Sequence, residues 1–180
     1  MLKFVFMINM PGQNPDTFSA VYQNDESYNL IVGSDNMDMA KELAAKYAAE
    51  GFTLFNLCGD FDDDITAAMA EIAGEGVRIK HADYLPEELA KLEAAASLEN
   101  YGIIIVMRGV EEPTELRLEC DECKVKAVFV KDLEQSEAVA AAMAEEGVDF
   151  IELCSWFDQE KTEAVSEAAG GKIPVGSCGL

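Results

Sequence analysis

Two stretches decide the fold: Glu50-Gly-Phe-Thr-Leu-Phe-Asn-Leu-Cys-Gly-Asp-Phe-Asp62 and, 96 positions later, Glu146-Gly-Val-Asp-Phe-Ile-Glu-Leu-Cys-Ser-Trp-Phe-Asp158. Both begin with Glu-Gly and end with Leu-Cys-x-x-Phe-Asp, with apolar residues between. The same register continues on either side, as in the pairs Thr66 and Thr162, Ala73-Gly74 and Ala169-Gly170, and Asp25-Glu26 and Asp121-Glu122. A chance similarity between alanine-rich helices would not reproduce the Glu-Gly, Leu-Cys-x-x-Phe-Asp and Ala-Gly segments at one spacing. The chain is therefore interpreted as a tandem duplication.

Each copy is predicted to follow the order β-β-β-α-β-α-β. In the first copy we expect strands at 3–9, 18–22, 28–32, 52–57 and 77–81, and helices at 37–50 and 62–74. In the second copy the strands are expected at 102–107, 115–119, 125–130, 148–153 and 173–177, and the helices at 133–146 and 158–170. Apolar residues at helical spacing, a glycine after each first helix and an aspartate before each second one support these bounds. Ahead of residue 24 the best offset is 98, so the first loop of the second copy should be two residues shorter.

Alternation of strands with helices predicts an α/β fold with a mostly parallel sheet, covered by helices on both faces. We expect the two copies in a pseudo-twofold arrangement. The predicted boundaries are a first repeat at 1–85, a connecting helix at 86–98 that opens with Pro86, and a second repeat at 99–180.

Charge narrows the range of partners. The 180 residues include 13 basic and 35 acidic ones, a net charge of −22 that both halves share. Such a surface repels phosphates and anionic lipid headgroups, which argues against nucleic-acid or membrane binding. Five cysteines at irregular spacing are typical of reduced thiols in a cytoplasmic protein. A covalent pseudo-dimer can be a monomer where a single-copy protein pairs, and a homo-oligomer is the alternative.

The segments Leu57-Cys-Gly-Asp-Phe61 and Ala169-Gly-Gly-Lys-Ile-Pro-Val-Gly176 suggest a family. They resemble those of short bacterial proteins catalogued only as a domain of unknown function. Those proteins look like one copy of the unit, and this chain looks like two. The resemblance implies the fold and no activity. The second copy departs from the family pattern at Ser155-Trp156.

Ligands of parallel sheets bind at the carboxyl ends of the strands. The first copy places Pro11, Gly12, Cys58, Asp60 and Phe61 there, and the counterparts in the second copy are Arg108, Gly109, Cys154, Trp156 and Phe157. We expect a site for a small molecule between the repeats, lined by these residues. Arg108 is the only cation predicted at this edge, so an anionic ligand would need it.

No reaction, cofactor or catalytic residue follows from these patterns. Cys58 and Cys154 precede helices, where a thiol can be reactive, but a cysteine that ends an apolar strand is more often a core residue. His81 could be a general base or a structural residue. The acidic first turn after Asp62 matches no calcium loop, and no metal site is predicted.

Two alternative functions stay open. One is a non-catalytic assembly or regulatory protein that meets a basic partner through its acidic surface. The other is a redox or metal-handling role for the Cys120-Asp-Glu-Cys123 pair in a predicted hairpin turn. A lone CxxC lacks the second pair of a structural zinc site.

Overall fold

The computed structural model describes all 180 residues and divides into two compact units, Met1–His81 and Ala82–Leu180. The first unit contains β1 (Leu2–Asn9), β2 (Ser19–Gln23), β3 (Ser27–Ser34), α1 (Met37–Ala49), β4 (Leu54–Leu57), α2 (Asp63–Ala73) and β5 (Arg78–His81). The second contains α3 (Pro86–Ala94), β6 (Asn100–Val106), β7 (Thr114–Glu119), β8 (Lys124–Val130), α4 (Leu133–Glu145), β9 (Phe150–Leu153), α5 (Gln159–Ala168) and β10 (Val175–Ser177).

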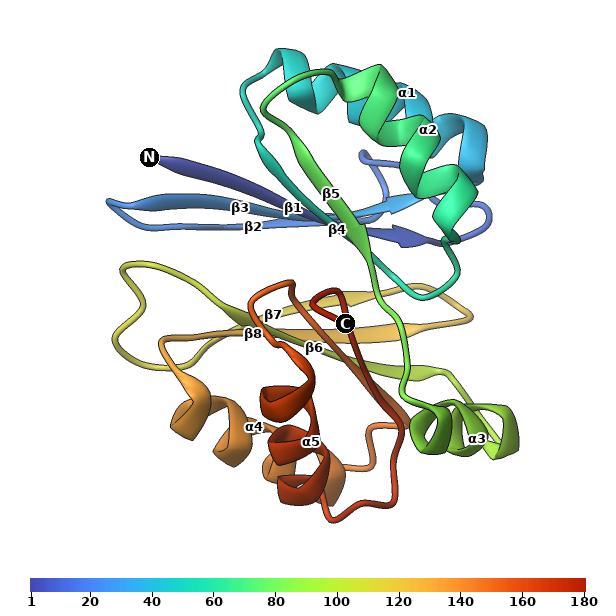
Figure 1. Cartoon of the computed structure of the whole chain (residues 1–180), viewed down its shortest axis with the longest axis vertical. Helices are drawn as coiled ribbons and strands as arrows, with labels where there is room; N and C mark the ends of the chain where they lie inside the picture. The colour runs from blue at the N-terminus through green and yellow to red at the C-terminus, as the bar shows by residue number, and fades with distance from the viewer. The chain divides into compact units, whose positions relative to one another are not determined.

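Each unit has one five-stranded sheet, and the two sheets have the same topology (Figure 1). The strand order is β2-β3-β1-β4-β5 in the first and β7-β8-β6-β9-β10 in the second, read in the corresponding direction. Only β2 and β7 are antiparallel to their neighbours. This confirms the predicted duplication of a mostly parallel α/β unit. No helix of the chain combines the length and apolar character that a membrane span requires.

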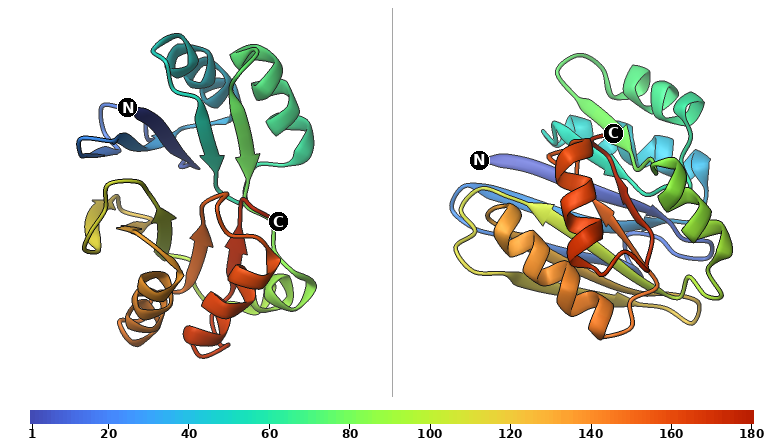
Figure 2. Two further views of the ribbon diagram at one scale, coloured as in Figure 1. Left: turned by 60° about the vertical axis from the view of Figure 1, so that its left-hand side comes forward. Right: turned by 60° about the horizontal axis from the view of Figure 1, so that its bottom comes forward.

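The prediction that helices cover both faces of a sheet was wrong. In each unit the two crossover helices lie on the same face, α1 with α2 and α4 with α5 (Figures 1 and 2). Right-handed crossovers that step in one direction across a sheet place their helices on one face. The steps β3 to β4 and β4 to β5 share that direction. The opposite step, from β1 to β3, passes through the hairpin strand β2 and carries no helix.

Alternation along β6 shows which residues face the helices. A Cβ at Gly102 would meet Sδ of Met143, on α4, at 2.9 Å, so Gly102 lies on the helix-covered face. Its neighbours Tyr101 and Ile103 then point to the helix-free face. Both neighbours are buried.

The expected offset of 98 in the first strands was also wrong. Phe4 pairs with Leu54 in the first sheet and Tyr101 pairs with Phe150 in the second, which sets β1 and β6 at an offset of 97. The strands β2 and β7 correspond at an offset of 96 residues, because Ser19 pairs with Val32 and Glu115 pairs with Val128. The loop is therefore one residue shorter in the second unit. The offset of 98 came from pairing Pro15 with Pro113, and both prolines lie in this loop, where the register changes.

The helix α3 belongs to the second unit. Its Glu88 carboxylate is 4% exposed and accepts hydrogen bonds from Ser166 Oγ at 2.7 Å and the Val175 backbone N–H at 2.9 Å. Lys91 Nζ lies 2.7 Å from the same carboxylate. These bonds attach α3 to α5 and β10. The boundaries at 85 and 98 stay a prediction.

Candidate functional site

Parallel strands bring the carboxyl ends of β1, β3, β4 and β5 to one edge of the first sheet. Three side chains meet where β1 and β4 end. The Asn9 backbone N–H donates to Cys58 Sγ over 3.3 Å, and Asn9 Nδ2 donates to Asp60 Oδ2 over 3.3 Å. Sequence reasoning selected Cys58 and Asp60 but missed Asn9. The available signal was a polar residue that ends an apolar strand.

The Pro11-Gly12 loop follows β1 and contacts the residue after β3, the other neighbour of β1 in the sheet. Gly12 has a φ of 79°, and its N–H donates to Asp35 Oδ1 over 2.5 Å, just beyond the end of β3. Both loop residues are exposed. The hydroxyl of Ser34, the register partner of Asn9, is buried and has no hydrogen-bond partner. This edge therefore contains one buried polar group whose hydrogen-bonding capacity is unused.

The loop after β4 is well packed. Cys58 and Phe61 are 5% and 2% exposed, and the Phe61 N–H donates to the Cys58 carbonyl over 3.2 Å. Asp62 caps α2 by accepting from the Ile65 N–H at 2.8 Å. His81 Nδ1 lies 3.0 Å from Thr66 Oγ1. His81 Nε2 also lies 3.9 Å from Asp63 Oδ1, and the role of the histidine stays a prediction.

The matching loop of the second unit differs in exposure along its length. Cys154 and Phe157 are buried, and burial raises the pKa of the Cys154 thiol to about 11. A thiol with that pKa is almost entirely protonated at neutral pH and is a poor nucleophile. Trp156 is 42% exposed and packs edge-on against Phe157, with Lys161 Nζ 5.0 Å from its ring centroid. Arg108 and Gly109 are also exposed.

The last residues of the chain pack on this loop. Ser177 Oγ donates to the Phe157 carbonyl over 2.7 Å and accepts from the Gly179 N–H at 2.9 Å. A Cβ at Gly179 would lie 2.0 Å from the Phe157 carbonyl oxygen, so only glycine fits there. The C-terminal segment thereby holds the backbone after Cys154 in place.

A buried carboxylate with two tyrosine donors lies beside this loop. Glu152 is 2% exposed in β9, and Tyr84 donates its hydroxyl hydrogen bond to Oε1 over 2.7 Å. The Tyr101 hydroxyl donates a hydrogen bond to Oε2. Glu152 shares the helix-free face with Tyr101, because its ladder partner is Ile103. The Tyr84 ring lies over Gly176, where a Cβ would come within 2.6 Å of it.

Sequence reasoning missed this cluster, although one signal was present. Glu152 sits in an otherwise apolar strand, and its counterpart in β4 is Asn56, which is also buried. A polar residue at the same position of a buried strand in both copies is unusual, because a buried polar group is costly unless it is hydrogen-bonded. Tyr84 gave no signal, since it lies outside the repeated segment.

The CxxC residues occupy the turn between β7 and β8. Cys120 N–H donates to the Cys123 carbonyl over 2.9 Å, and both thiols are free. Burial, followed by the neighbouring Cys120, raises the pKa of Cys123 to about 11. No group of three or more His, Cys, Asp or Glu side chains is arranged to hold a metal ion.

These features define a two-unit α/β protein with polar groups at the carboxyl ends of its parallel strands. The chain belongs to the family of unknown function DUF6506, whose model matches residues 2–97 and again 99–179. No curated protein matches its sequence. A carbohydrate transporter from Acidothermus cellulolyticus 11B, solved with myo-inositol, is similar at 8% identity and a TM-score of 0.34, over 98% of this chain and 73% of the transporter chain.

Proposed function

We propose that the protein binds a small polar molecule at the strand carboxyl ends, and that Glu152 in the second unit is the group that recognises it. One observation carries the proposal: a carboxylate that is 2% exposed and accepts hydrogen bonds from Tyr84 and Tyr101. Removing a carboxylate from water is expensive, and apolar residues would stabilise a strand at least as well. A buried acid in a β-strand is therefore a reason to look for function.

The chemistry of the cluster indicates the class of ligand. Both tyrosine hydroxyls donate to the carboxylate, so the cluster offers acceptor oxygens within a low-dielectric environment. A ligand that presents hydroxyl or ammonium groups matches it. The net charge of −22 disfavours an anion at this position.

The position of Glu152 agrees with the edge chosen from the sequence. Only Leu153 separates it from Cys154, and the exposed Trp156 follows in the same loop. Pro11, Gly12 and Asp60 stay candidates at the strand ends of the first unit and Arg108 at those of the second, whereas Phe61 and Phe157 are buried.

A thermal-shift screen of neutral polyols and small amines at fixed pH tests the proposal, because a ligand specific for the folded state raises the melting temperature by mass action. Wild type should respond to at least one compound, and Glu152→Gln should lose the response. Glu160→Gln, which removes an exposed acid from α5, is the matched control and should behave as wild type. A compound that shifts Glu152→Gln as much as wild type would argue against Glu152 as the recognition group.

The redox alternative gains no specific support. Burial raises the pKa of Cys123, which lowers the thiolate fraction that thiol–disulfide exchange requires. The assembly alternative rests on the acidic surface alone.

A further inference from the structure

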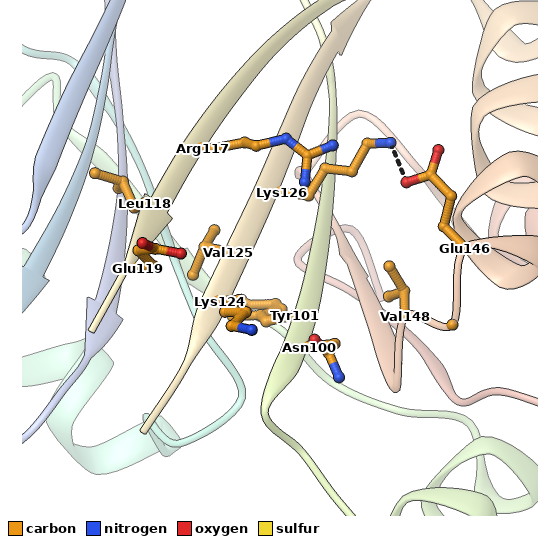
Figure 3. Close-up of a pocket in the computed structure, with 11 residues that line it drawn as sticks. Asn100, Tyr101, Arg117, Leu118, Glu119, Lys124, Val125, Lys126, Glu146 and Val148 are labelled. Atoms are coloured by element: carbon orange, nitrogen blue, oxygen red, sulfur yellow. Dashed lines mark hydrogen bonds and ion pairs between the residues drawn. The ribbon is translucent and has the colours of Figure 1, made fainter. Parts of the chain in front are cut away.

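A hollow lies at the opposite, amino-terminal edge of the second sheet. Its volume is about 130 Å³, well below the roughly 300–1,000 Å³ of pockets for drug-sized ligands. Figure 3 shows its lining, in which the side chains come from β7, β8, the start of β6 and the segment between α4 and β9. Three of the lining residues are cations, namely Arg117, Lys124 and Lys126. Two acids, Glu119 and Glu146, also line it.

Two of these cations oppose each other directly. Arg117 and Lys126 are register partners on β7 and β8. Like charges at such positions destabilise a sheet. Acids offset part of the repulsion, since Lys126 Nζ lies 2.6 Å from Glu146 and 3.2 Å from Glu115, as the dashed line to Glu146 in Figure 3 indicates. The arrangement is thus one that sheet stability alone would not favour.

Arg117 and Lys124 keep nitrogen atoms that could bind a ligand. Arg117 uses Nε for its ion pair with Glu115, which leaves the two terminal nitrogens of a guanidinium whose side chain is 67% exposed. Lys124 is exposed and forms no ion pair in the structure, and its register partner on β7, Glu119, also lines the hollow. A guanidinium fork with a nearby ammonium matches the geometry of a carboxylate or phosphate group.

The first unit shows what the same position looks like when it is filled. There Phe52 packs against Tyr28 at a centroid distance of 5.8 Å and against Tyr47 at 5.3 Å. Lys3 Nζ lies over the Phe52 ring at 5.5 Å. The second unit replaces these aromatic residues by smaller or charged ones, with Lys124 for Tyr28, Met143 for Tyr47 and Val148 for Phe52. The same position of the fold is therefore filled by aromatic side chains in the first unit and is a hollow lined by cations in the second.

We propose that this hollow binds a small anion through a carboxylate or phosphate group, held by Arg117 and Lys124 over Lys126, whose side chain is 12% exposed. The size of the hollow restricts the ligand to a short carboxylic acid or a phosphate. The hollow shares Tyr101 with the Glu152 cluster, but its cations do not contact Glu152, and the proposal does not depend on the function proposed for that residue.

The test is an NMR titration of the ¹⁵N-labelled full chain with inorganic phosphate and, separately, with succinate, at constant pH and ionic strength. The backbone amides of Lys124, Gly147 and Val148 should shift and saturate with at least one of the two anions. Whichever anion binds more tightly identifies the recognised group. Arg117→Gln and Lys124→Gln should each weaken binding by about tenfold, the loss expected for one charge-assisted contact.

Two further variants sharpen the test. Lys172→Gln removes an exposed cation of the same unit and should bind as wild type. Val148→Phe restores the residue of the first copy and should abolish binding with every cation retained. If Val148→Phe does not fold, the two charge variants decide alone. Shifts that do not saturate with either anion, or equal affinity in wild type, Arg117→Gln and Lys124→Gln, would overturn the proposal.

Discussion

At the scale of single residues, Gly176 determines whether Tyr84 can reach Glu152. A Cβ at Gly176 would lie 2.6–2.8 Å from the Tyr84 ring. Gly176→Ala should therefore displace the ring and lower the free energy of unfolding by about 1–3 kcal/mol, the range for overpacking. In a Tyr84→Ala background the same change should have almost no further effect. Urea unfolding of the four proteins measures this coupling, and additive losses would show that Gly176 and Tyr84 act independently.

The buried Cys154 thiol should make the free energy of unfolding fall with rising pH in the alkaline range. Burial raises its pKa from 9.0 to about 11 in the folded protein. Below pH 9 both the folded and the unfolded thiol are protonated, so the stabilisation is complete there. As pH rises from 9 to 11 the unfolded thiol ionises first, and about 3 kcal/mol of stability should be lost.

Cys154→Ala removes this term. Its free energy of unfolding should fall less steeply between pH 9 and pH 11 than that of the wild type, as followed by urea denaturation. Gln159→Ala, which changes an exposed and non-ionisable side chain of α5, is the control. Identical slopes in wild type and Cys154→Ala would contradict the burial account.

At the scale of elements, Glu88 holds α3 in the second unit through Ser166 and the Val175 N–H. Glu88→Ala should leave a buried N–H without an acceptor and lower stability by about 2–3 kcal/mol. Amide hydrogen exchange in α3 should accelerate as the helix detaches. The exposed neighbour Glu87 provides the control, because Glu87→Ala should leave exchange unchanged. Unaltered protection of α3 in Glu88→Ala would mean that other contacts hold the helix.

The elements also show what a sequence can predict. The Asp62 and Asp158 caps and the glycines after helices are local signals, and the helix bounds followed from them. Coverage on one face depended on strand order, which no local signal encodes. Within the candidate site, Cys58 and Asp60 were predictable from the edge rule, whereas Tyr84 reaches Glu152 through tertiary packing, 68 positions apart in sequence.

At the scale of the whole molecule, the net charge of −22 affects the stability of the folded state. Mutual repulsion of 35 acidic groups against 13 basic ones disfavours the compact state, and salt screens it. The free energy of unfolding should therefore rise between about 0.02 M and about 0.5 M NaCl, where the Debye length falls well below 10 Å. Urea titrations at the two salt concentrations measure this change in the free energy of unfolding. A decrease would mean that local ion pairs such as Lys126 with Glu146 outweigh the repulsion.

The measurement that tests the central claim most directly is isothermal titration calorimetry with the polyol or amine that gives the largest thermal shift. Binding to wild type, Glu152→Gln and Glu160→Gln would be compared at one pH, with circular dichroism to confirm that each is folded. The proposed role of Glu152 predicts a loss of affinity of about tenfold or more, at least ~1.4 kcal/mol, in Glu152→Gln and none in Glu160→Gln. Equal affinity in all three folded proteins, or no polyol or amine that binds wild type, would contradict it.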